Sequence, residues 1–112
     1  MRLGDIAHAR SGDKGGGANI GVLAFNEEGF EFLLSTLSAD RVAAYFEPMQ
    51  PGEVRRYELP NLLALNFVLP TVLAGGGSRS LRIDAQGKCL GQILLEMPLE
   101  IDPQRFARCA RR

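Results

Sequence analysis

The chain has 112 residues, about the size of one domain, and 46% of them are hydrophobic, enough to bury a core without disulfides or metals. Thirteen basic and thirteen acidic residues give a formal net charge of zero, and aromatic residues are few, which disfavours nucleic-acid binding. The longest uncharged apolar segment, residues 59–77, is broken by prolines and asparagines, so it is not expected to span a membrane. The charged N-terminus is unlike a signal peptide, and the expected compartment is therefore the cytosol, with Cys89 and Cys109 reduced.

The first strands are predicted from apolar patterning and glycine content. Residues 2–10 are predicted to form a strand that ends in a glycine-rich loop at 11–17. Residues 18–25 follow as a second strand. That segment is apolar at both alternating sets of positions, as expected of a central or tightly packed strand.

Two helices and a third strand are predicted next. Residues 30–37 place apolar side chains on one stripe at helical spacing. Residues 39–46 continue as a second helix, for which Ser38 is a plausible N-cap. Residues 53–59 alternate in a way that predicts a strand with one solvent-exposed face.

The segment at residues 62–74 carries no charge and is predicted to be a helix, kinked at Pro70. A helix that covers a sheet normally presents a polar stripe to water, and this one offers only Asn66 and Thr71. We therefore expect another chain to cover it, which makes it a predicted subunit interface. The alternative is a core helix whose outer side is covered by the Arg-rich C-terminal tail.

Residues 80–84 and 88–97 are predicted to form a terminal hairpin. The predicted order is thus β-β-α-β-α-β-β, in an α+β two-layer sandwich of ferredoxin-like character, with a mostly antiparallel sheet and helices on one face. The predicted domain covers residues 1–98, and residues 99–112 form an Arg-rich tail.

The segment at residues 8–19 concentrates reactive side chains in one strand, loop and strand. Period-two alternation places His8 and Arg10 on the same face. Glycines that expose backbone N–H groups can form an anion-binding concavity, to which nearby basic side chains add charge. The residue order fits neither a P-loop nor a dinucleotide-binding loop. The ligand-binding residues predicted here are Arg10, Lys14, Gly15, Gly16 and Asn19.

The same segment contains the residue types of a catalytic triad, His8, Ser11 and Asp13. His8 could also act alone as a general acid or base. No nucleophile elbow surrounds Ser11, so the alternative is a hydrogen-bond network that only fixes the loop. With one histidine and separated thiols, the sequence predicts no metal site, and it carries no cofactor motif.

A second glycine-rich loop occupies residues 75–80. Its Ser78 and Arg79 could bind a carboxylate or a phosphate. The alternative is a flexible connection with one solvated arginine.

Three blocks of the sequence are distinctive: Leu3-Gly-Asp-Ile-Ala-His-Ala-Arg-Ser-Gly-Asp-Lys-Gly15 with Asn19-Ile-Gly-Val22, Tyr57-Glu-Leu-Pro-Asn-Leu-Leu-Ala-Leu-Asn-Phe67, and Gly75-Gly-Gly-Ser-Arg-Ser-Leu-Arg-Ile-Asp-Ala-Gln-Gly-Lys88. Together they resemble the C-terminal, ferredoxin-fold-like domain of the acyclic terpene utilisation (AtuA) family. The similarity runs over residues 2–97. In that family the domain usually follows a much larger N-terminal domain, and members are associated with bacterial catabolism of acyclic terpenes and branched acids through acyl-CoA thioesters.

The resemblance implies a small free-standing subunit that acts with a large AtuA-type subunit in terpene or acyl-CoA catabolism, the polar residues above lining a site or a junction. One alternative is a stand-alone acyl-CoA hydratase or isomerase that uses His8. Another is a homo-oligomeric ligand-binding module without chemistry. The expected partners are further copies of the chain, the large subunit, or an acyl-CoA or carboxylate ligand, with neither nucleic acid nor membrane involved.

Overall fold

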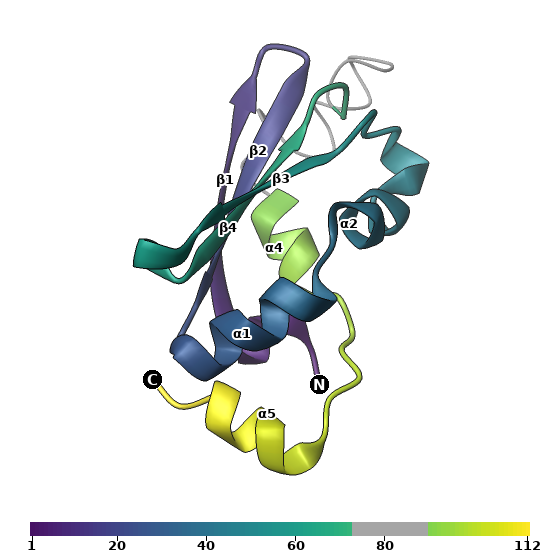
Figure 1. Ribbon diagram of the computed structural model, residues 1–112. Coiled ribbons are helices and arrows are strands. Elements are labelled where there is room, and N and C mark those ends of the chain that lie inside the picture. Colours follow the sequence, from purple (N-terminus) through teal and green to yellow (C-terminus); the bar gives the residue numbers. More distant parts are fainter. Residues whose placement is uncertain (73–89) are drawn as a thin grey trace.

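The computed structural model describes residues 1–72 and 90–112, apart from the side chain of Lys14. Short 3-10 helices (η) separate several of the main elements. In chain order the elements are η1 (Leu3–Asp5), β1 (Ala7–Lys14), β2 (Gly17–Ala24), α1 (Glu27–Thr36), α2 (Ala39–Tyr45), η2 (Glu47–Met49), β3 (Arg55–Leu59), η3 (Pro60–Leu62), β4 (Ala64–Leu69), α4 (Leu90–Leu95) and α5 (Pro103–Cys109). The strands and α-helices are labelled in Figure 1.

The described strands form one four-stranded sheet in the order β1-β2-β4-β3, and every neighbouring pair is antiparallel. Helices α1, α2 and α4 lie on one side of the sheet, and α5 lies beyond its end, against α1 (Figure 1). The core is the layer between the sheet and these helices. This arrangement confirms the predicted α+β class, an antiparallel sheet with helices on one face.

The N-terminal hairpin is longer than predicted. Residues Leu3 to Asp5 form a 3-10 helix instead of strand, with Leu3 fully buried, and β1 then continues to Lys14. The predicted loop at residues 11–17 is therefore wrong. Pairing runs as far as Lys14 opposite Gly17, which leaves a tight turn whose Gly15 has a φ of 65°, a conformation that favours glycine.

Each of the two helices predicted after the first hairpin is preceded by a side chain that caps it. The Ser38 hydroxyl accepts a hydrogen bond from the Arg41 amide at 3.0 Å, which confirms Ser38 as an N-cap. Helix α1 starts earlier than predicted because Asn26 caps it, accepting from the Gly29 amide at 2.8 Å. The side chains that these helices bury include Phe30, Phe32, Leu33, Leu37, Val42 and Phe46.

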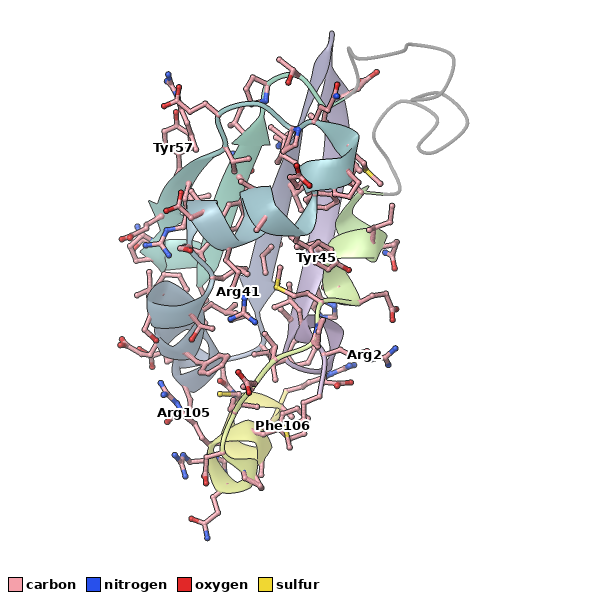
Figure 2. All side chains as sticks on the ribbon, turned by 90° about the vertical axis from the view of Figure 1, so that its right-hand side faces the viewer. Arg2, Arg41, Tyr45, Tyr57, Arg105 and Phe106 are labelled. Carbon is pink, nitrogen blue, oxygen red and sulfur yellow. The ribbon has the colours of Figure 1, made fainter. Side chains whose placement is uncertain are left out.

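Contacts between side chains and backbone carbonyls tie α2 to the C-terminal elements. The Tyr45 hydroxyl donates to the Ile93 carbonyl of α4 at 2.7 Å, and the Arg41 guanidinium donates to the Pro98 carbonyl at 3.1 Å; both side chains are labelled in Figure 2. Partial burial and the nearby Glu96 raise the pKa of Tyr45, so this hydroxyl stays protonated at neutral pH.

The uncharged segment is not a helix. Ala64 to Leu69 forms β4, which pairs with β2 on one side and with β3 on the other. Its Leu65, Phe67 and Leu69 are fully buried under the helices. The backbone of a central strand is paired on both edges, and the helices of the same chain cover one of its faces. The lack of charged residues in this segment is therefore explained without a second chain. The predicted helix at residues 62–74 is wrong, and the subunit interface inferred from it loses its basis.

The predicted terminal hairpin is also wrong in its second arm. Leu90 to Leu95 is α-helical, and Leu90 and Leu94 are buried against the sheet. Gly91 packs closely on β1, where a Cβ at this residue would lie 3.3 Å from the Ala9 Cβ. The first predicted arm, residues 80–84, lies outside the described residues.

The C-terminal segment contains a packed helix. Asp102 caps α5, accepting hydrogen bonds from the next amides at 3.0 and 3.1 Å, and Cys109 is fully buried. Asn26 then holds the end of α5, because its amide donates to the carbonyls of Arg108 at 2.8 Å and Arg111 at 2.7 Å. The Glu28 carboxylate adds contacts at 3.5 Å to the side chains of Arg105 and Arg108. The boundary at residue 98 stays a prediction, but α5 is an integral contact of α1.

Candidate functional site

The sheet has a second face, opposite the helices, that no described element covers (Figure 1). We call this surface the open face. Successive residues of a strand point to opposite faces, so the pairing register determines which residues belong to it. They are His8, Arg10 and Gly12 of β1, Asn19, Gly21 and Leu23 of β2, Ala64, Asn66 and Val68 of β4, and Arg55, Tyr57 and Leu59 of β3.

Two glycines leave a hollow in the open face. A Cβ at Gly12 or Gly21 would meet no atom closer than 3.9 Å, so close packing does not require glycine at either position. The hollow has a volume of about 450 Å³, and Arg10, Asn19 and Leu23 lie around it. Beside the hollow, the side-chain amide of Asn19 on β2 donates a hydrogen bond to the side-chain oxygen of Asn66 on the neighbouring β4 at 3.3 Å. We call this space the Arg10 hollow.

The charge around the Arg10 hollow is positive. Arg10 is exposed, and in the described part of the chain no carboxylate lies within ion-pair distance of it. The acidic residues of β1 and β3, Asp13 and Glu58, are on the opposite face by register. A second, smaller hollow of about 240 Å³ lies over β3 and the end of β4, lined by Arg55, Tyr57 and Val68 together with Glu53 and Pro70.

His8 lies at the other end of the open face. Its ring contacts the Phe25 ring edge to face at a centroid distance of 4.7 Å. The Arg112 guanidinium lies 4.4 Å from the centre of the same Phe25 ring. His8 and Arg10 share a face, as the alternation predicts, but His8 is outside the Arg10 hollow.

The structure does not bring His8, Ser11 and Asp13 together as a triad. Ser11 and Asp13 lie on the helix-facing side of β1, whereas His8 lies on the open face. The Ser11 hydroxyl accepts a hydrogen bond from the Gly91 amide at 2.9 Å. Gly91 follows Leu90, the first described residue of α4, so this bond joins the described start of the helix to a neighbouring strand in the manner of a cap.

Because Ser11 caps α4, Ser11→Ala is expected to lower the free energy of unfolding by about 1 kcal/mol. Urea denaturation followed by circular dichroism measures the change. The matched control is Ser35→Ala, which removes an exposed hydroxyl that bonds to the Phe32 carbonyl of its own helix. Equal midpoint shifts in the two variants would contradict the capping role.

The remaining predicted ligand-binding residues are spread over the molecule. Asn19 lies beside Arg10 at the hollow, whereas Gly15 and Gly16 are exposed at the tip of the β1–β2 hairpin. Lys14 ends β1, and Ser78 and Arg79 lie outside the described residues. Sequence reasoning missed Gly21 and Leu23, which line the hollow once β1 pairs with β2. It also missed Asn66, which only the pairing of β2 with β4 brings beside Asn19.

In residues 1–72 and 90–112 no group of three or more His, Cys, Asp and Glu side chains could hold a metal ion. No helix in the same ranges is long and apolar enough to cross a bilayer.

Comparison with known proteins gives one positive result. No curated protein and no solved structure matches the chain. The AtuA ferredoxin-like domain family matches residues 1–100, a range that includes every strand of the described sheet and ends before α5 begins. The ferredoxin-like character expected from the sequence agrees with this match, and the chain belongs to the AtuA ferredoxin-like domain family.

Proposed function

We propose that this chain is a cytosolic accessory domain that packs through its open face on a larger AtuA-type polypeptide. Together the two would act in the catabolism of acyclic terpenes or of acyl-CoA thioesters. Membership of the AtuA ferredoxin-like domain family supports the choice of partner, because the resemblance implies a domain that works beside a much larger one.

The observation that carries the proposal is the apolar edge of the open face. Tyr57 is 48% exposed and Leu59 is 41% exposed, and both extend from β3 on that face. Leu62, in the following turn, is 63% exposed. Figure 2 shows Tyr57 standing out at the edge of the molecule. Clustered exposed apolar side chains mark interaction sites, and tyrosine is enriched at the centres of protein interfaces.

The shape of the open face also supports a protein partner. A small-molecule site usually encloses most of its ligand, whereas the two hollows of this face open directly to solvent. His8, the acid or base of the alternative stand-alone enzyme, is exposed and outside both hollows. A broad sheet face with shallow hollows matches another protein surface better than a single small substrate.

The test is co-expression with a larger AtuA-type polypeptide, followed by native mass measurement and by calorimetry of the separated components. We expect a complex of fixed stoichiometry, whose affinity falls at least about tenfold in Tyr57→Ala. Gln92→Ala is the control, because Gln92 is exposed on α4, on the other side of the sheet. Absence of a complex, or equal affinities of the two variants, would contradict the proposal. A closed homo-oligomer without the large chain would support the ligand-binding module instead.

A further inference from the structure

We propose that the Arg10 hollow receives an acidic side chain of the partner polypeptide, whose carboxylate pairs with the Arg10 guanidinium. This inference rests on the proposed function, since it requires a protein that covers the open face. It adds the chemistry of the contact and the residue that anchors it.

The distribution of charge points to an acidic occupant. The chain as a whole is neutral, with thirteen basic and thirteen acidic residues. The register nevertheless gives the open face of β1 and β2 an arginine and a histidine and no carboxylate, and sends Asp13 to the other side. Of the described arginines, Arg2, Arg56, Arg105 and Arg108 have acidic partners, whereas Arg10 and the others do not. Arg10 differs from the other unpaired arginines in standing beside the glycine-lined hollow, where an acidic group of a covering protein can reach it.

The hollow provides the space for that group. Arg10 lies directly opposite Gly21 in the β1–β2 register, and Gly12 lies opposite Asn19. Glycine inside a strand weakens the strand, and it often marks a place where another molecule approaches closely. Neither glycine is needed for packing within the described residues, and the space above both is open to a side chain from another protein.

The residues around the hollow fit the two ends of an Asp or Glu side chain. A guanidinium binds a carboxylate through two parallel hydrogen bonds. The Asn19 amide stands on the same face, held by its hydrogen bond to Asn66. Leu23 supplies an apolar wall for the methylene groups of the guest. The site is thus polar at one end and apolar at the other.

The open shape of the hollow explains why a protein is needed to complete it. An ion pair in contact with water contributes little, because solvent screens both charges. A partner that covers the face excludes this water, and the same pair then becomes stronger and more selective. Arg10 is therefore expected to act as an anchor within the complex while binding free carboxylates poorly.

The experiment measures the affinity of the complex by calorimetry at two salt concentrations. We expect Arg10→Ala to weaken binding at least about thirtyfold and to reduce the salt dependence, with partial recovery in Arg10→Lys. Gly21→Ala is expected to weaken binding because the added methyl group fills the hollow. The fold should be unaffected, because a Cβ at this position meets only atoms 3.9 Å or more away within the chain. Circular dichroism and thermal unfolding confirm that each variant is folded.

Arg111→Ala is the matched control, because Arg111 is an exposed arginine that follows α5 and is not part of the open face. Equal losses of affinity in Arg10→Ala and Arg111→Ala would overturn the inference, since the partner would then respond only to overall charge. If the wild-type chain binds and Tyr57→Ala weakens it while the Arg10 and Gly21 variants bind normally, the inference fails and the proposed function stands. If the wild-type chain forms no complex, the proposed function itself fails.

Discussion

Gly17→Ala is expected to lower the free energy of unfolding by about 3 kcal/mol or more. Gly17 begins β2 at the point where the end of β4 passes next to it. A Cβ there would lie 2.5 Å from the Pro70 carbonyl oxygen and 2.7 Å from that of Leu69. Both are backbone atoms, so the clash cannot be relieved by a side-chain rotation, and the two strands would have to separate.

Urea denaturation of Gly17→Ala and Gly12→Ala side by side tests this expectation. Gly12 is also a strand glycine of the same hairpin, but its nearest neighbour to an added Cβ is 3.9 Å away. Gly12→Ala is expected to change the free energy of unfolding by less than about 0.5 kcal/mol. Alanine loses less conformational entropy on folding than glycine, and this gain offsets the slight crowding of the added methyl group. Similar losses of stability in the two variants would show that the close approach of Gly17 to β4 is not the reason why Gly17→Ala is destabilising.

Asn26→Asp is expected to cost about 2 kcal/mol through the attachment of α5. Aspartate is as good an N-cap as asparagine, so the bond from the Gly29 amide is retained. A carboxylate cannot donate, however, and the bonds to the Arg108 and Arg111 carbonyls are lost. The substitution therefore separates the two roles of this side chain and leaves the end of α5 without its clamp.

The thiol of Cys109 reports on this attachment. Burial, with a smaller contribution from Glu28, raises the pKa of the thiol, although Arg105 and Arg108 act in the opposite direction. The neutral thiol is therefore favoured by folding, and this stabilisation is lost only as the pH rises through the raised pKa. Because Cys109 is fully buried, we expect little alkylation at pH 8 in the wild-type chain and at least about tenfold faster alkylation in Asn26→Asp.

Site-resolved mass spectrometry follows the alkylation of Cys109 separately from Cys89. Asn61→Asp is the control, because Asn61 is exposed in η3, far along the chain from the clamp. Equal labelling rates of Cys109 in the wild-type chain and Asn26→Asp would mean that the clamp does not hold α5 in place.

Helices α1 and α2 and strand β3 could be predicted because their signals are local. Ser38 caps a helix, the apolar stripe of α1 has helical spacing, and β3 alternates. The uncharged segment was misassigned because a continuous apolar run suits a buried helix and a buried strand equally. Leu65, Phe67 and Leu69 do recur at a period of two, and Pro70 ends the run, so those positions held the missed signal.

The C-terminal helices were missed for two different reasons. Leu90 and Leu94 of α4, and Met97 just after it, recur at helical spacing, but Gly91 and the β-prone neighbours weakened that pattern. For α5 the signal was Asp102 followed by Pro103 at the first helical position, which is typical of a helix start. The Arg-rich composition of residues 99–112 favoured the interpretation as a tail instead.

The candidate site could be predicted only for residues whose placement follows from alternation within a single strand. Alternation along β1 places His8 and Arg10 on a common face. It also places Ser11 on the other face once the strand continues past residue 10, but the glycines that follow suggested a loop there. Gly21 and Asn66 are far apart in sequence, so their meeting at the hollow depends on tertiary pairing that no local pattern contains.

The strand order has a consequence for the route by which the chain folds. β1 with β2, and β3 with β4, are hairpins whose pairing is local. The ladder between β2 and β4 joins Ala18 to Leu69 across both intervening helices, and it is the only ladder between the hairpins in the described sheet. Closing such a long loop costs entropy before the contacts form, which slows folding. Each hairpin is thus expected to form early and the joining of their inner strands to set the folding rate, with Gly17 at the far end of that seam.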